Sequence, residues 1–184
     1  MKEQFLYPSE SETRRVFDMS GLWEFQVDFE SVGRENDWEQ GLPDPTQVPV
    51  PASYNDLFTD KKIREHVGDV WYQKEFYVDE SWQDKVINLR FGSATHRATV
   101  WINGEKVVSH EGGYMPFIAP LNDIVEFGAK NKVVVVVNNE LDYTTIPCGK
   151  VKEYDDGKKR LFPFFDFFNY AGIHADVKLL VLPP

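Results

Sequence analysis

Short runs of β-forming residues, separated by turn residues, recur along this chain and constrain its fold more than any other feature. Some runs alternate apolar and polar residues and others are continuously apolar, as half-buried and fully buried strands do. They are "LWEFQV" (22–27), "VWYQKEFYV" (70–78), "VINLRF" (86–91), "ATVWI" (98–102), "EKVVSH" (105–110), "KVVVVVN" (132–138) and "VKLLVL" (177–182). Many short strands with little helix predict an all-β fold, a jelly-roll β-sandwich.

Two of these runs carry more specific information. "NG" at 103–104 separates two β-rich runs. It predicts a tight hairpin, because both residues adopt positive φ readily. The five consecutive valines at 133–137 predict a central strand that is buried on both faces.

Helix signals are sparse. "PLNDIVEFG" (120–128) predicts one short helical turn, with Asn122 as its cap and Gly128 beyond its end. We expect at most one or two such turns in the whole chain. The segments between the strands are longer than hairpin turns and are where binding residues usually lie on a rigid sandwich. We expect long loops at 29–46, 51–69 and 139–172.

Charge and length exclude several classes of function. The chain has 184 residues, enough for one domain with a sizeable core, and a formal net charge of -10. Its one basic run, 158–160, is too short to neutralise a phosphate backbone, so we interpret it as a solvated loop and expect no nucleic-acid partner. The longest apolar run, the valines, is far below the ~20 residues that span a bilayer, so no membrane association is expected.

Cysteine, histidine and the first residues bear on compartment and metals. One cysteine, Cys148, cannot form an internal disulfide, and "MKEQFLYPSESETRR" lacks the apolar segment of a signal peptide. A cytoplasmic protein is therefore expected. The histidines show no metal-ligand spacing, so we predict no metal site and interpret them as surface or hydrogen-bonded structural residues. They are His66, His96, His110 and His174.

One acid, Asp166, lies within the aromatic stretch "LFPFFDFFNYAGIHADV" (161–177). An ionised carboxylate in apolar surroundings is costly unless its oxygens accept hydrogen bonds, so either the backbone or a ligand must donate to it. Aromatic rings can stack on a pyranose while a carboxylate accepts from its hydroxyls, which makes sugar binding one hypothesis. A core or interface loop, with the acid satisfied by nearby backbone N–H groups, is the other.

Residue spacing reveals no catalytic centre. The sequence has no Gly-rich phosphate loop, nucleophile elbow or zinc motif. "NNEL" (138–141) places an Asn-Glu pair at a strand end, but we interpret Glu140 as a surface acid in the turn after the valine strand. His110 and Glu111 are adjacent, so on a strand they would point to opposite faces.

Seven segments carry a resemblance to a known family, in family order and almost end to end. They are "LYPSESETR", "MSGLWEFQVD", "VPVPASYND", "GDVWYQKEF", "VWINGEKVVSHEGGYMPF", "VVVNNELDYTTIP" and "DFFNYAGIH". The chain resembles the N-terminal sugar-binding domain of the β-glucuronidases in glycoside hydrolase family 2. "HEGGYMPF" and "DFFNYAGIH" are specific to glucuronidases within that wider family.

This resemblance implies one galactose-binding-domain-like jelly roll over 1–184. In the parent enzyme an immunoglobulin-like domain and a catalytic (β/α)₈ barrel follow, and both are absent here. Both catalytic glutamates of the family belong to the barrel. The parent is thus expected to be a retaining, homo-oligomeric β-glucuronidase without a cofactor, and this segment to have no catalytic residue and no activity alone. Glu140 precedes Leu141, whereas the family's acid/base glutamate precedes a proline.

The resemblance also implies a role for the aromatic stretch. In the family, the aspartate of "DFFNYAG" reaches the mouth of the active site and binds hydroxyls of the glycone, and this aspartate is Asp166 here. A glucuronide carries its own carboxylate, so Asp166 is expected on the hydroxyl side of the sugar. The residues around it are expected to support the loop and pack against the barrel: Phe164, Phe165, Phe167, Phe168, Asn169 and Tyr170.

Two positions depart from the family pattern. Ala175 stands where an arginine is usual, which puts that arginine's ion pair in doubt, and Lys178 is the nearby candidate to replace it. Cys148 stands where a second proline is common, so the loop 146–149 is expected to be less rigid. Two alternatives to the enzyme domain stay open: an independent carbohydrate-binding module and a purely structural domain.

Overall fold

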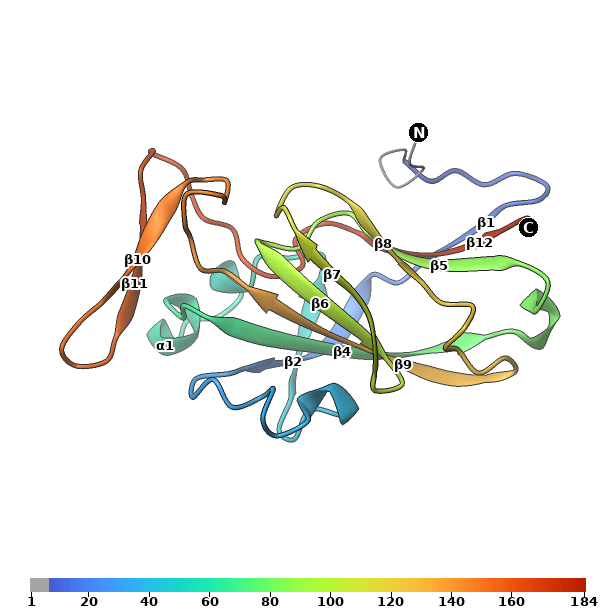
Figure 1. Ribbon diagram of the computed structural model, residues 1–184, viewed down its shortest axis with the longest axis horizontal. Coiled ribbons are helices and arrows are strands. Elements are labelled where there is room, and N and C mark those ends of the chain that lie inside the picture. The colour runs from blue at the N-terminus through green and yellow to red at the C-terminus, as the bar shows by residue number, and fades with distance from the viewer. Residues whose placement is uncertain (1–6) are drawn as a thin grey trace.

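Two antiparallel β-sheets make up the body of the protein, as the computed structural model shows for residues 7–184 (Figure 1). The six-stranded sheet has the order β3 (Thr46–Val50), β2 (Gly21–Val27), β4 (Asp69–Val78), β9 (Ala129–Asn138), β6 (Arg97–Ile102) and β7 (Glu105–Glu111). The four-stranded sheet has the order β1 (Arg15–Asp18), β12 (Val177–Leu182), β5 (Val86–Phe91) and β8 (Phe117–Pro120). The predicted all-β sandwich is confirmed. The prediction that the chain has no signal peptide used its first fifteen residues. Residues 1–6 of that segment lie outside the described part.

The strand predictions made from the apolar runs are confirmed, and so is the hairpin. Asn103 and Gly104 join β6 to β7 with φ values of 51° and 85°. Both residues lie in the left-handed region that this two-residue turn requires.

The valine strand, β9, is buried on both faces because two different layers cover it. Val133, Val135 and Val137 point into the core between the two sheets. Val134 and Val136 point to the opposite face, where they pack with a second cluster of buried residues contributed by neighbouring strands and by the segment after β2. That cluster contains Trp38, Leu42, Trp71 and Trp101. A strand that is buried on both faces has apolar residues at successive positions, which explains the run of five valines.

No helix forms over 120–128: the N–H groups of Ile124 and Val125 close a single turn on the carbonyl of Leu121, and Asn122 is not its cap. Instead of capping a helix, its Oδ1 accepts from the N–H of Ile87 at 2.8 Å and its Nδ2 donates to the carbonyl of Lys85 at 2.6 Å. The segment is a hydrogen-bonded turn that closes the start of β5. The short helices lie in other loops: η2 (Trp38–Gln40), η3 (Tyr54–Asp56), α1 (Lys61–Arg64) and η4 (Glu80–Trp82).

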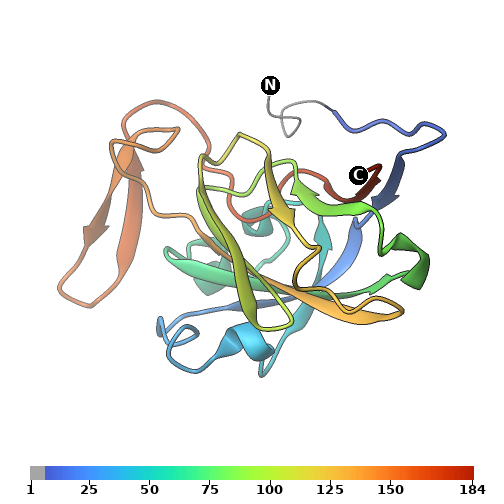
Figure 2. The same ribbon diagram turned by 45° about the vertical axis from the view of Figure 1, so that its right-hand side comes forward.

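The segment 139–172 is not a continuous loop, because it contains a separate two-stranded hairpin of β10 (Gly149–Glu153) and β11 (Lys159–Pro163). In both views this hairpin projects from one end of the molecule, and the C-terminus lies toward the other end (Figures 1 and 2). The basic run 158–160 is exposed, as expected, but it forms the end of the hairpin turn and the start of β11.

The hydrophobic core between the two sheets is rich in aromatic side chains. Phe25 on β2 packs against Tyr54, Phe58 and Tyr72, with ring centroids 5.0 to 5.8 Å apart. This packing fixes the positions of the strand ends from which the candidate site is built. Within residues 7–184 no helix has the length and apolarity to cross a membrane.

Candidate functional site

The aromatic loop, defined here as residues 164–170, follows β11 directly and leads back into the sandwich. Its first residue is fixed to the preceding segment, since the N–H of Phe164 donates to the carbonyl of Cys148 at 2.9 Å. After the loop the chain is buried: the N–H of Ala171 donates to Ser53 Oγ at 3.1 Å. Gly172 has φ +89°, and a Cβ there would overlap the hydroxyl of Tyr72, so only glycine fits where the loop re-enters.

Asp166 lies at the middle of this loop and its side chain is exposed. Among the residues that the structure describes, no hydrogen bond or ion pair to its carboxylate is found. The sequence left open whether the backbone or a ligand donates to this acid. The described part of the chain supplies no donor, so Asp166 remains available to an external group.

The phenylalanines around Asp166 are exposed as well. Phe165 and Phe168 expose 68% and 54% of their surface, and Phe164 and Phe167 expose 44% each. Phe164 and Phe167 contact Tyr143 and Tyr114, with centroid distances of 5.5 and 6.1 Å. These tyrosines, with Met115 and Ile146, extend the exposed apolar surface beyond the loop. Apolar patches of this kind commonly mark binding surfaces.

Asn169 and Tyr170 form the end of the loop. Asn169 Oδ1 is 2.6 Å from His96 Nε2, and Asn169 Nδ2 donates to the carbonyl of Asn139 at 3.4 Å. The ring of Tyr170 contacts Phe168 at 5.0 Å and His174 at 6.1 Å between centroids. Asn169 is the more deeply seated of the two, since Tyr170 is exposed.

The sequence analysis did not single out His96 as part of this site. It is buried, and it lies 73 residues before Asn169. Burial lowers the pKa of His96, an effect that its hydrogen bond to Asn169 Oδ1 opposes and nearby Arg97 and His174 strengthen. No local pattern could have paired His96 with Asn169, because the contact depends on how β6 and the end of the aromatic loop pack.

The two departures from the family pattern have identifiable surroundings. Next to Ala175, Asp176 pairs with Lys178 at 3.4 Å and with Arg90 at 3.8 Å. Cys148 is a free, half-buried cysteine whose Sγ donates to the carbonyl of Tyr143 at 3.4 Å. These contacts lie on either side of the aromatic loop.

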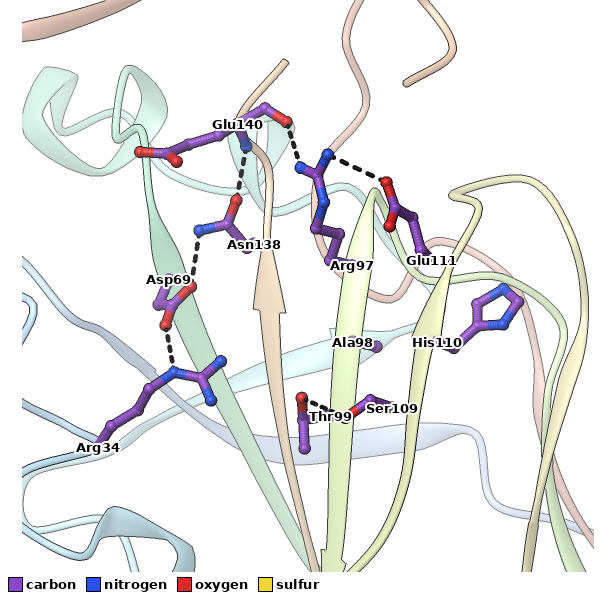
Figure 3. A pocket seen from close by; sticks show the side chains of 10 residues that line it. All are labelled: Arg34, Asp69, Arg97, Ala98, Thr99, Ser109, His110, Glu111, Asn138 and Glu140. Carbon is purple, nitrogen blue, oxygen red and sulfur yellow. Dashed lines mark hydrogen bonds and ion pairs between the residues drawn. The ribbon is translucent and has the colours of Figure 1, made fainter. Parts of the chain in front are cut away.

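A polar cleft of about 630 Å³ opens at one end of the six-stranded sheet (Figure 3). At this end β4 and β6 begin and β7 and β9 end. Arg34 Nε lies 3.2 Å from Asp69 Oδ2, and Asn138 Nδ2 donates to the other oxygen of Asp69 at 2.7 Å. The remaining lining residues are Arg97, Ala98, Thr99, Ser109, His110, Glu111 and Glu140.

Two carboxylates at the edge of this cleft come close together, which raises the question of glycosidase chemistry. Glu111 and Asp142 both pair with Arg97 Nη2, and Thr144 Oγ1 lies 2.8 Å and 2.7 Å from their oxygens. The hydroxyl and amide of Thr144 together with Arg97 lower the pKa of Asp142. A general acid needs a raised pKa instead, which Asp142 does not have; the two acids form an ion network around Arg97.

The other acids considered from the sequence also have structural partners. Glu140, in the segment after β9, is partly exposed, and its Oε1 pairs with Lys159 on β11 at 3.0 Å. On β7, the His110 ring stacks on Phe117 with centroids 4.4 Å apart, while Glu111 turns toward Arg97. The two side chains diverge as predicted. The described residues contain no group of three or more His, Cys, Asp or Glu side chains that could hold a metal ion.

The protein is a β-sandwich with one exposed aromatic loop, and its family gives this fold a more specific class. Residues 16–183 match the family model described as "Glycosyl hydrolases family 2, sugar binding domain". The chain belongs to this family, as its sequence motifs predicted.

Individual relatives show which enzymes of this family the chain is similar to. The chain is 46% identical over 180 residues to a β-glucuronidase from Paenibacillus borealis, and 38% identical over 202 residues to a β-glucuronidase from Homo sapiens. These alignments cover 95% and 97% of this chain but 30% of each relative. The crystal structure of Ruminococcus gnavus β-glucuronidase superposes with a TM-score of 0.95 at 46% identity, over 100% of this chain and 31% of that one. A second structure of that enzyme, in complex with D-glucuronic acid, matches with the same TM-score over 32% of its chain. The chain thus spans about a third of the length of these relatives.

Proposed function

We propose that this chain is the N-terminal, non-catalytic sugar-binding domain of a retaining β-glucuronidase, and that Asp166 contacts the glycone in the complete enzyme. The observation that carries the proposal is the exposed carboxylate of Asp166, which has no donor among the described residues although it lies in an aromatic loop. Relatives named as β-glucuronidases over nearly the whole chain support the parent activity.

The chemistry of hydrolysis is assigned to the remainder of the parent chain. Retaining hydrolysis needs two carboxyl groups about 5–5.5 Å apart, one of them with a raised pKa. Glu111 and Asp142 share Arg97 as their ion-pair partner, and the pKa of Asp142 is lowered, chiefly by its hydrogen bond with Thr144, rather than raised. This domain therefore contributes binding and packing surface, and the proposal needs no cofactor.

Charge determines which side of the sugar Asp166 faces. A glucuronide carries a carboxylate of its own, which would repel the Asp166 carboxylate at short range. Asp166 is therefore assigned to ring hydroxyls, which can donate to it, and the sugar acid is bound by other residues of the parent. The phenylalanines on either side then pack against the catalytic domain and hold the loop in place.

The kinetic test uses the complete enzyme. Asp166→Ala removes one charged contact that is strongest in the transition state, so kcat/KM for a chromogenic glucuronide should fall by about 10- to 1,000-fold. Asp155→Ala is the matched control, because Asp155 is an exposed acid in the β10–β11 turn, outside the aromatic loop. If both variants keep the kcat/KM of the unmodified enzyme, the assignment of Asp166 is wrong.

The 184-residue chain alone tests whether this domain is non-catalytic and binds the sugar only weakly. It should hydrolyse no glucuronide and bind glucuronic acid weakly, because one charged hydrogen-bonding group supplies only about 1.5–3 kcal/mol against the entropic cost of association. Calorimetric titration measures the binding. Micromolar affinity would favour an independent carbohydrate-binding module, and turnover that survives purification would contradict the non-catalytic role.

A further inference from the structure

The aromatic loop has few directional contacts with the body of the protein. Its internal hydrogen bonds, from Phe167 N–H to the Phe165 carbonyl and from Tyr170 N–H to the Phe168 carbonyl, shape the loop without tying it down. Within the described part of the chain, every hydrogen bond between residues 165–170 and the rest of the molecule comes from the side chain of Asn169. This amide lies three positions after Asp166.

The partner of this amide, His96, is held firmly. It exposes 1% of its surface and immediately precedes β6. Its N–H donates to the carbonyl of Asn138 at 2.6 Å, and its carbonyl accepts from the N–H of Gly112 at 3.1 Å. The backbone of His96 is thus fixed to the end of β9 and to the residue after β7, and burial confines its imidazole.

The hydrogen-bond geometry selects one tautomer of His96. Asn169 Nδ2 donates to the carbonyl of Asn139, so its Oδ1 faces His96 and can only accept. The proton of the neutral imidazole must therefore be on Nε2. His96 Nδ1 is left as a buried lone pair without a hydrogen-bond partner, beside Gly113, where a Cβ would lie 2.9 Å from it. A second proton on Nδ1 would have no acceptor.

We infer that His96 is a positioning residue: through the amide of Asn169 it fixes the aromatic loop, and with it the place of Asp166. The effect of this anchor on Asp166 and on sugar binding rests on the proposed function. The ring contacts of Phe164 and Phe167 are made at the exposed surface and have little directionality, whereas the buried hydrogen bond fixes one arrangement. Small displacements of a binding group can cost about 100-fold in rate. Beyond Phe164, the Asn169 side chain makes every hydrogen bond from residues 165–170 to the rest of the described chain, so the position of Asp166 is sensitive to its loss.

The first test measures loop order in the 184-residue chain by NMR relaxation. In the unmodified chain the backbone order parameters of residues 165–170 should approach those of the strands, about 0.85. In His96→Phe, which keeps a ring but removes the donor, they should fall below about 0.6 while β4 and β9 stay unchanged. His96→Gln, whose side-chain N–H can donate, should restore much of the order. Asn169→Ala removes the same hydrogen bond from the loop side. It replaces His96→Phe in this test if that variant does not fold.

The second test separates the anchor from the substrate contact, using kcat/KM in the complete enzyme. His96→Phe should lower kcat/KM by about 10-fold or more, and should have little further effect when Asp166 is already alanine. Unchanged order parameters in both His96→Phe and Asn169→Ala overturn the inference, whatever the kinetics show. A loosened loop with a kinetically silent Asp166→Ala leaves the anchor supported and overturns the proposed function instead.

Discussion

Phe25 and Phe165 are the same amino acid in opposite environments. Phe25 lies between the sheets with 1% of its surface exposed and has three aromatic neighbours, whereas Phe165 exposes 68%. The core has enough apolar side chains to be complete without the aromatic loop. Exposed aromatic residues gathered at one loop commonly mark a binding surface, and this supports the proposal that the loop packs against another part of the parent enzyme.

Asp28 and Asp166 differ in the same way. Asp28 is buried and accepts from the N–H groups of Val32 and Gly33, both at 2.8 Å, and from the indole of Trp71 at 3.4 Å. It folds the segment after β2 over the outer face of the six-stranded sheet. Asp166 has none of these donors. One aspartate is built into the fold, and the other has no donor among the described residues, which is why we propose that it contacts a ligand.

The largest difference should appear when the two phenylalanines are each truncated. Phe25→Ala removes a buried ring and should lower the free energy of unfolding by about 3–5 kcal/mol. Phe165→Ala should change it by no more than about 0.5 kcal/mol. Urea denaturation of both variants measures this. A cost above about 2 kcal/mol for Phe165→Ala would show that the loop belongs to the core.

The two aspartates should differ next. Asp28→Ala leaves buried N–H donors without an acceptor, at about 1–3 kcal/mol for each donor that water cannot reach. Asp166→Ala should leave the free energy of unfolding within about 0.5 kcal/mol of the unmodified chain. The same denaturation experiment applies. Equal losses in both variants would mean that Asp166 is a structural acid with partners of its own.

A smaller effect is expected from pH. Burial lowers the pKa of His66, His96 and His174 below the usual 6.5. A depressed pKa means that the folded state favours the neutral ring, so this stabilisation is complete above pH 6.5 and is lost as the pH falls through the folded-state pKa. Unfolding midpoints in urea should therefore decrease from pH 7.5 to pH 5. His96→Gln should reduce that decrease, and an unchanged pH dependence would argue against a buried neutral His96.

The same contrast explains how much of the fold the sequence predicts. β9 and the hairpin at 103–104 are predictable because a valine run and an Asn-Gly pair act locally. β3 escapes detection because Pro49 interrupts it, which an edge strand tolerates. β10 and β11 are short, charged and exposed, so they lack the apolar alternation of a half-buried strand.

The candidate site is only partly predictable from the sequence. Its location at "DFFNY" follows from the density of aromatic residues around one acid and from the family motif. The anchor does not follow, because His96 and Asn169 meet only through tertiary packing, and a single histidine without metal-ligand spacing carries no local signal. Asn122 was assigned to a helix for the same reason: its actual partners, Ile87 and Lys85, lie on a distant strand end.

Hydroxyl-radical labelling tests the central claim, that the aromatic loop is a surface completed by the rest of the parent enzyme. Phe165 and Phe168 are measured in the 184-residue chain and in the complete enzyme, with Phe29 as the reference because it is similarly exposed, at 56%, outside the loop. We expect both loop phenylalanines to be labelled readily in the chain alone and to be protected several-fold in the complete enzyme, relative to Phe29. Equal labelling of Phe165 and Phe168 in the two proteins would contradict the account.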